Sequence, residues 1–244
     1  QACADRLCPA LRALGVQRID KAICTHLDAD HAGGMKRLIE AGLVAEIVAP
    51  PFSLIENTLP DLASCINRYN IPHRTYWSGE VIWQDVFSDA ERPFRLKCLN
   101  PSQYSDGGND DSLVIHLSFQ AFDLLVTGDI SEGVERTLCP VIDGLDVNWD
   151  VLVVSHHGSK YSSCRPFLET VAPSCSVISV GRYNNYGHPA PQILERLAAV
   201  GSAVWRTDQD GCIHMTFSGS HITIVPWLHR LRPVRFRPSD NLIA

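Results

Sequence analysis

Thr25-His26-Leu27-Asp28-Ala29-Asp30-His31-Ala32-Gly33-Gly34 is the most informative stretch of this sequence. It follows a β-rich apolar run over 19–24 and precedes a helical pattern over about 33–41, so we expect a loop between a strand and a helix. Alternate residues of an extended segment project to the same side, whereas a bend turns later residues to a neighbouring point. One such loop can therefore serve two cations. Its potential metal ligands are His26, Asp28, Asp30 and His31.

The ligand types in this loop indicate the kind of site. Imidazole and carboxylate together suit Zn²⁺, Mn²⁺ or Fe²⁺, and the lack of a cysteine in the loop argues against a closed structural zinc site. The alternative is a polar turn in which an aspartate caps the following helix. A cap needs one carboxylate and leaves the two flanking histidines unexplained, so we favour the metal site.

Two further apolar strands end in residues of the same kind. The run over 124–129 ends in Asp129, which is placed either to bridge two metals or to cap the helix expected over 131–138. The run over 150–159 ends in His156 and His157, and such groups ligate metals or transfer protons; a hydrogen-bonded turn is the alternative. His188 follows in a loop. Strand ends that supply ligands from distant parts of the chain predict one metal site at the rim of a sheet.

The rest of the pattern predicts sheets covered by helices, in an α/β or α+β architecture. We expect helices over 3–14, 33–41, 54–69 with a break near Pro60, 131–138, 164–171 and 191–200. Strands are expected over 19–24, 46–49, 73–76, 80–86, 94–99, 112–119, 123–127, 150–154, 175–180, 203–206, 211–217 and 221–226. We take 1–226 as one domain and 227–244 as a basic tail, which is either a solvated terminus or an arm that faces phosphate. The basic residues of the tail are Arg230, Arg232, Arg235 and Arg237.

Composition sets limits on function. The chain has 244 residues, is 45% hydrophobic and carries a formal charge of −6, which argues weakly against nucleic acid without excluding it. No apolar run approaches the ~20 residues that cross a bilayer, so we expect no membrane span in this chain. The nine cysteines are scattered without CxxC pairs, which favours reduced thiols over a disulfide framework. Motifs for nucleotide binding and the GxSxG elbow of serine hydrolases are missing from the sequence.

The motifs resemble a known superfamily. His26-x-Asp28-x-Asp30-His31 is similar to the HxHxDH signature of metallo-β-lactamase hydrolases, with Asp28 where most members have a second histidine. Together with LLVTGD over 124–129, SHHGSKYSS over 155–163 and NNYGHP over 184–189, it resembles the carboxy-terminal hydrolase domain of ComEC DNA-uptake proteins and their free-standing relatives. The likeness covers about 10–217. It implies a four-layer αββα sandwich, here without its amino-terminal strands, with the site at one edge of the two sheets.

The resemblance also implies roles for particular residues. His26 and Asp28 would hold one metal ion, Zn²⁺ or Mn²⁺, and Asp30, His31 and His188 the other, with Asp129 as the bridge. His156 or His157 would be a proton donor or an additional ligand. Where the superfamily usually supplies another histidine, this chain has Gly108-Asn109-Asp110-Asp111-Ser112, which is similar to the Asn- and Ser-bearing stretch of the ComEC group. The substrate contacts that we expect are Asn109, Ser112 and Ser159.

The predicted reaction is hydrolysis by a water that two metal ions activate. Asp30 would orient this water, while His156 or His157 would protonate the leaving oxygen. The resemblance favours DNA or another phosphodiester as the substrate. One alternative is a hydrolase of the same fold that acts on a small ester, lactone or thioester. Another is a non-catalytic, metal-dependent DNA-binding module of an uptake apparatus. A free-standing protein would be cytosolic, whereas a domain of a ComEC-like protein would face outside the cytoplasmic membrane; the sequence predicts no oligomeric state.

Overall fold

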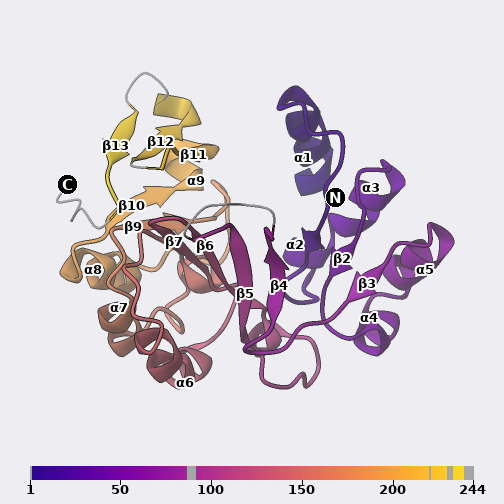
Figure 1. Ribbon diagram of the computed structural model, residues 1–244, viewed down its shortest axis with the longest axis horizontal. Helices are drawn as coiled ribbons and strands as arrows, with labels where there is room; N and C mark the ends of the chain where they lie inside the picture. Colours follow the sequence, from indigo (N-terminus) through magenta and orange to yellow (C-terminus); the bar gives the residue numbers. More distant parts are fainter. Residues whose placement is uncertain (1, 87–91, 220, 230–232, 239–244) are drawn as a thin grey trace. The chain divides into compact units, whose positions relative to one another are not determined.

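The computed structural model describes residues 2–86, 92–219, 221–229 and 233–238. They form two compact units (Figure 1), each of which is treated separately. The first unit comprises Gln1–Glu80 and Asn100–Leu113, and the second comprises Val81–Leu99 and Val114–Ala244. The chain therefore leaves the first unit after residue 80, returns to it at residue 100 and leaves it again after residue 113.

The first unit is built on a small parallel sheet. Its strands lie in the order β1 (Ala22–Ile23), β2 (Ile47–Val48) and β3 (His73–Arg74). Parallel neighbours need long connections, and helices provide them here. Apolar side chains of the strands and helices, such as Ile39, Ile47, Ile55 and Ile66, form one buried core. The helices are α1 (Ala2–Ala13), α2 (Ala29–Ala32), α3 (Met35–Glu40), α4 (Phe52–Thr58) and α5 (Pro60–Arg68).

The second unit contains a mixed sheet of seven strands, in the order β10-β9-β8-β7-β6-β5-β4. Strands β7 to β10 are parallel neighbours, whereas β6 runs antiparallel to β7 and β4 runs antiparallel to β5. The bounds are β4 (Val81–Gln84), β5 (Arg95–Asn100), β6 (Val114–Phe119), β7 (Phe122–Val126), β8 (Val151–Val153), β9 (Cys175–Ile178) and β10 (Ala203–Arg206). Carboxyl ends of parallel strands meet at one edge, so the residues after β7 and β8 gather there.

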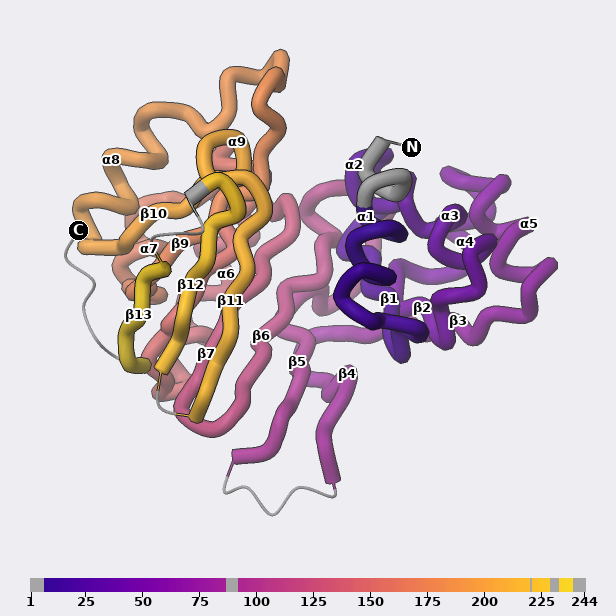
Figure 2. The backbone as a smooth tube through the Cα atoms, turned by 90° about the horizontal axis from the view of Figure 1, so that it is seen from above, coloured from indigo at the N-terminus to yellow at the C-terminus, as the bar shows by residue number. Residues whose placement is uncertain are grey.

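Different elements pack on the two faces of this sheet. Leu125 and Leu152 point into a core shared with α6 (Glu132–Asp143), α7 (Arg165–Val171) and α8 (Pro191–Ala199). Leu124 and Val151, which precede them in sequence, point to the opposite face. There they pack against an antiparallel sheet of β11 (Ile213–Phe217), β12 (Ile222–Pro226) and β13 (Val234–Phe236). Figure 2 shows this small sheet beside the seven-stranded sheet. The period of two along each strand thus separates two apolar cores.

The structure agrees with the predicted α+β class and refines several elements. Pro60 separates α4 from α5 because proline suits the first turn of a helix and disrupts its interior. Helix α6 continues to Asp143, beyond the predicted end, because Leu138 and Ile142 both pack into the core. The sequence did not predict the short helix α9 (Thr207–Asp210), or strand β13 within the segment expected to be a basic tail.

Other expectations concern membranes, cysteines and the tail. In the part of the chain that the structure describes, no helix has both the length and the apolar character that a bilayer span requires. The cysteines whose side chains are described carry free thiols, as expected. Arg235 belongs to β13, whereas Arg230 and Arg232 lie outside the described residues. The proposed domain limit at residue 226 stays a prediction.

Candidate functional site

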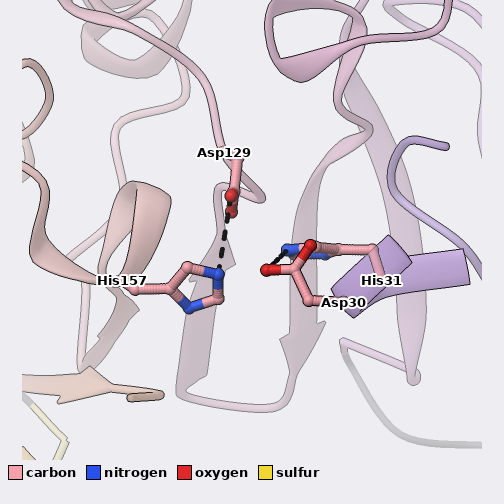
Figure 3. Close-up of side chains that lie close together, drawn as sticks. All are labelled: Asp30, His31, Asp129 and His157. Atoms are coloured by element: carbon pink, nitrogen blue, oxygen red, sulfur yellow. Dashed lines mark ion pairs between the residues drawn. The ribbon is translucent and has the colours of Figure 1, made fainter. Parts of the chain in front are cut away.

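The loop after β1 carries two pairs of a histidine and an aspartate. His26 is fully buried, and its Nε2 atom lies 3.8 Å from Oδ2 of Asp28. Nε2 of His31 lies 3.9 Å from Oδ2 of Asp30, the pair drawn with a dashed line in Figure 3. Both distances exceed those of a hydrogen bond, which is about 2.7–3.2 Å for N–H···O. In each pair an imidazole nitrogen and a carboxylate oxygen therefore lie near each other without bonding directly.

The hydroxyl of Thr25 contacts the other ring nitrogen, Nδ1, of both imidazoles. Its Oγ1 atom lies 3.1 Å from Nδ1 of His26 and 3.0 Å from Nδ1 of His31, whose ring centroids are 4.1 Å apart. Oγ of Ser112 lies 3.2 Å from Nδ1 of His26 as well. A histidine that ligates a metal through one ring nitrogen usually hydrogen-bonds through the other. The contacts at Nδ1 therefore leave Nε2 as the atom of each ring that is available to a metal.

The structure also tests whether the loop is merely a capping turn. Asp28 occupies the N-cap position of α2 in an extended conformation. Among the described residues, however, its side chain makes no capping hydrogen bond to that helix. The exposed carboxylate of Asp28 instead lies beside His26. The local geometry thus favours a ligand over a cap.

A second loop of the first unit packs against the ligand loop. Leu113 N–H donates to the carbonyl of Thr25 at 2.9 Å, and Leu27 N–H donates to the carbonyl of Gly107 at 2.9 Å. Gly107 has φ +80°, and a Cβ atom there would come within 2.8 Å of the Leu27 side chain. Only glycine combines this backbone conformation with so close an approach. These contacts hold the loop that contains residues 108–112 against the loop that carries His26 and His31.

Asp111 shapes this second loop. It is buried, and its Oδ2 atom accepts backbone hydrogen bonds from Ser105 at 2.8 Å, Asp106 at 3.0 Å and Gly107 at 2.7 Å. Asn109 begins the short 3₁₀ helix Asn109–Asp111. The side-chain Oδ1 atom of Asn109 is buried, and no described residue donates a hydrogen bond to it. A buried acceptor of this kind suits a cation or a ligand donor.

In the second unit, Asp129 follows the end of β7. It is 4% exposed, and Ser131 rather than Asp129 holds the N-cap position of α6, so the capping alternative is wrong. Oδ2 of Asp129 lies 3.5 Å from Nε2 of His157 and 3.9 Å from Nε2 of His156. Figure 3 shows the ring of His157 directed at the Asp129 carboxylate. One carboxylate thus faces two imidazole nitrogens.

The backbone of Ser179 fixes the tautomer of His157. Nδ1 of His157 lies 2.6 Å from the carbonyl oxygen of Ser179. A carbonyl only accepts hydrogen bonds, so Nδ1 carries the proton and donates it. In the neutral ring, Nε2 then presents a lone pair to Asp129. The arrangement is that of a metal-ligating histidine oriented by a backbone carbonyl.

The two histidines stand on a strained turn. His156 has φ +49° and His157 has φ +54°, in the left-handed region that residues other than glycine rarely adopt. Gly158 follows with φ +80°, and a Cβ atom there would lie 2.6 Å from Cβ of Pro189. Ala190 N–H donates to the Gly158 carbonyl at 2.9 Å. The turn is therefore locked against the segment that carries His188, and strain of this kind is concentrated at functional sites.

Glu135 on α6 stabilises the loop that carries His156 and His157, a role that the sequence did not predict. Its buried carboxylate accepts hydrogen bonds from Ser163 N–H at 2.6 Å, Cys164 N–H at 2.8 Å and Ser155 Oγ–H at 2.9 Å. Burial raises the pKa of the Glu135 carboxyl, and these donors partly oppose that rise. A glutamate on a helical pattern is usually solvent-exposed, so nothing in the sequence distinguished this one.

His188 and Ser159 complete the predicted residues of the second unit. The side chain of Asn184 forms two hydrogen bonds of 2.9 Å with the backbone of His188. Its Oδ1 atom accepts from the His188 N–H, and its Nδ2–H donates to the His188 carbonyl. The His188 ring lies 6.0 Å from that of His156 and stacks on Tyr186 at 5.8 Å. Burial lowers the pKa of His188, the neighbouring histidines lower it further, and Asp129 partly opposes this shift. Ser159 is buried and accepts from Tyr161 N–H at 3.4 Å, so its contact with substrate stays a prediction.

The predicted site residues thus fall into two groups, each brought together within its own unit. Both groups offer imidazole nitrogens and carboxylate oxygens, a donor set that fits Zn²⁺ or Mn²⁺. The first group, in the first unit, is His26, Asp28, Asp30, His31, Asn109 and Ser112. The second group, in the second unit, is Asp129, His156, His157, Ser159 and His188.

Comparisons with known proteins agree with this chemistry. Residues 2–57 match the family described as the metallo-beta-lactamase superfamily. The chain is 28% identical over 212 residues to ComE operon protein 3 of Bacillus subtilis, which covers 86% of this chain and 26% of that protein. It is 32% identical over 208 residues to competence protein ComA of Neisseria gonorrhoeae, which covers 84% of this chain and 26% of that protein. The chain thus spans about a quarter of the length of these relatives.

A solved structure supports the fold. The chain superimposes on a CmlA beta-hydroxylase E377D mutant with a TM-score of 0.52 and 12% identity, over 78% of this chain and 43% of the other. At that identity the likeness concerns the fold alone. The resemblance predicted from the motifs is confirmed: the chain is related to the metallo-β-lactamase superfamily and, over most of its length, to competence proteins of the ComEC family.

Proposed function

We propose that this chain is a metal-dependent phosphodiesterase that hydrolyses DNA. In this proposal the two groups of ligands act together and hold two divalent cations, Zn²⁺ or Mn²⁺. His26 and Asp28 would hold one cation, and Asp30, His31 and His188 would hold the other. Asp129 would be a ligand shared by both, and His157 or His156 would be a further ligand or a proton donor.

The observation that carries the proposal is the orientation of His157. Its Nδ1–H donates to a backbone carbonyl, so the lone pair of Nε2 in a neutral ring is directed at the Asp129 carboxylate 3.5 Å away. Two electron-rich atoms at this distance repel each other, and a divalent cation between them turns repulsion into coordination. Protonation of the ring is the competing explanation. Metal titration separates the two, because only coordination depends on the cation.

The residues would contribute to hydrolysis in distinct ways. When bound, the cations supply Lewis acidity, which favours deprotonation of water and polarises the phosphoryl group. Asp30 accepts a hydrogen bond from the attacking water and orients it. His156, which is 30% exposed in its side chain, donates a proton to the leaving oxygen. The buried amide oxygen of Asn109 lies in the stretch 108–112, where the superfamily usually supplies a histidine.

The choice of DNA depends on the relatives. One of them is named as a competence protein, and the matched region is 26% of each relative. The formal charge of −6 does not attract a polyanion at long range. Recognition of phosphate therefore has to arise locally, from bound cations and from nearby basic side chains.

The test combines metal analysis with a nuclease assay on the purified chain. We expect two equivalents of Zn²⁺ or Mn²⁺ in the wild type and metal-dependent cleavage of single- or double-stranded DNA. His31→Gln and Asp129→Asn should each lose metal and at least 100-fold in rate. His214→Gln and Asp20→Asn are the matched controls, because both side chains are exposed and belong to neither ligand group. Unchanged metal content in both ligand variants would refute the assignment.

The same assay separates the alternatives. Turnover of a small ester, lactone or thioester without cleavage of DNA would favour a hydrolase of another substrate class. DNA binding that requires metal but gives no cleavage would favour a non-catalytic module. The departure from the family pattern over 108–112 makes this a specific alternative.

A further inference from the structure

A basic cavity lies on the seven-stranded sheet, apart from the second group of ligands. Its volume is about 280 Å³, and its polar lining includes Arg92, Arg95, Lys97, His116 and Ser118. Leu145 and Val147, which follow α6, form part of its apolar wall. We propose that this cavity binds a phosphate group, either as free phosphate or as part of a nucleotide or nucleic-acid strand.

The strand pattern explains why these side chains meet. Arg95, Lys97 and Leu99 are every second residue of β5, and Leu99 packs into the core beneath the helices. On β6, every second residue is Val114, His116 and Ser118, and Val114 packs into the same core. Alternate residues share one face of a strand, so all four polar side chains lie on the helix-covered face of the sheet. They occupy the part of that face where α6 has ended.

The basic side chains of this cavity differ in whether a carboxylate neutralises their charge. Asp123 is buried and pairs with Arg92 through two hydrogen bonds of 2.8 and 3.1 Å, and with His116 Nε2 at 2.7 Å. Arg95 and Lys97, in contrast, form no ion pair with any described residue. The Nε atom of Arg95 is buried as well, and no described residue accepts its hydrogen bond.

This imbalance points to an anionic ligand. Two partly buried cations on one strand repel each other, and each has given up part of its hydration. With a formal charge of −6, the chain has carboxylates that could neutralise Arg95 and Lys97. The carboxylate of Asp123, however, pairs with Arg92 and His116. Guanidinium and ammonium groups that converge in a cavity match the oxygens of phosphate. The Ser118 hydroxyl supplies a further donor.

The cavity and Asp129 lie toward opposite ends of β7. Ser118 pairs with Asp123 at the start of this strand, whereas Asp129 follows its end. The volume is just below the ~300 Å³ at which ligand pockets usually begin, which suits a phosphate or a single nucleotide unit. The inference does not depend on the proposed hydrolysis, since the cavity is lined by neither group of metal ligands.

The test is a binding titration of the full chain in excess EDTA, so that no divalent cation contributes to phosphate binding. The probes are inorganic phosphate, deoxyadenosine 5′-monophosphate and a ten-nucleotide single-stranded DNA. Calorimetry measures the affinity for each probe. We expect saturable binding by the wild type and at least tenfold weaker binding by Arg95→Gln and by Lys97→Gln.

Arg165→Gln is the matched control, because it removes the same charge from an exposed arginine of the same unit. We expect it to bind like the wild type, and the melting temperature of each variant without ligand shows whether the variant is folded. Absence of saturable binding by the wild type would overturn the inference, as would equal weakening in Arg165→Gln. Undiminished affinity in both cavity variants would overturn it too. Equal affinity for all probes identifies free phosphate as the ligand, and tighter binding of the oligonucleotide identifies the DNA backbone.

Discussion

Thr25 offers the sharpest test of the first group of ligands, through the change Thr25→Val. Valine keeps the branched shape of threonine and removes only the hydroxyl that contacts Nδ1 of His26 and of His31. The fold of the loop should survive, because its backbone hydrogen bonds to Leu113 and Gly107 do not involve this side chain. We expect the variant to bind metal more weakly, since both rings lose their contact with the Thr25 hydroxyl, although the His26 ring keeps its contact with Ser112 Oγ.

The two hydrogen bonds set the size of the effect. Each contributes about 0.5–1.5 kcal/mol, so their loss weakens metal binding by about 1–3 kcal/mol. At about 1.4 kcal/mol per factor of ten, this corresponds to a dissociation constant roughly 5- to 150-fold higher. Changes in the groups that orient metal ligands typically cost about 10- to 100-fold in affinity, which is the same range.

Competition with a chromophoric chelator for Zn²⁺ or Co²⁺ measures the affinity. Thr25→Ser is the control, because it retains the hydroxyl and should bind within about threefold of the wild type. Urea unfolding in EDTA shows whether Thr25→Val is stable without metal. A folded Thr25→Val protein with wild-type affinity would show that the hydroxyl does not orient the ligands, and the reasoning would fail.

Three other predictions concern the second unit. Glu135→Ala strips the acceptor from two buried backbone N–H groups, so the free energy of unfolding in urea should fall by about 2–6 kcal/mol; a loss below about 1 kcal/mol would contradict this role. Gly158→Ala forces a methyl group against Pro189 in a left-handed conformation and should destabilise by about 1–3 kcal/mol or more, seen as a lower melting temperature; an unchanged melting temperature would refute the close approach. Burial alone would raise the pKa of Asp123, but hydrogen bonds from His116 and Arg92 hold it below the ordinary 3.8. Its contribution to stability is therefore present above that value and is lost as pH falls through the lower folded pKa. Urea midpoints should fall below about pH 4 in the wild type and fall less steeply in Asp123→Asn, and parallel curves would refute the assignment.

Much of the fold was predictable because apolar periodicity reports burial directly. The strands of the seven-stranded sheet carry Leu125, Leu152 and Ile178 at positions that only a buried strand tolerates, and each was expected close to its observed bounds. The short strand β13 was missed, because Val234 and Phe236 stand among arginines and prolines that favour an irregular terminus. The pairing of β13 with β12 depends on tertiary contacts, which the local sequence does not encode.

The candidate ligands were predictable for a different reason. Histidine and aspartate crowded into a loop after a strand have few structural roles, so the pattern itself is informative. Asp111 and Glu135 lack such a signal, because each is an ordinary acidic residue until the fold buries it. Both then accept hydrogen bonds from backbone N–H groups of a loop that carries predicted site residues. Sequence patterns thus indicated the groups that could bind metal, and missed the groups that hold them in place.

The strained turn at His156 and His157 shows why such support is needed. Two consecutive left-handed residues cost on the order of 1–3 kcal/mol each, and they persist only where the surroundings enforce them. Here the restraints are the carboxylate of Glu135, which holds Ser155, and the contact of Gly158 with Pro189. The fold therefore maintains a strained turn that directs two imidazoles at one carboxylate, which is the arrangement that the proposed cation site requires.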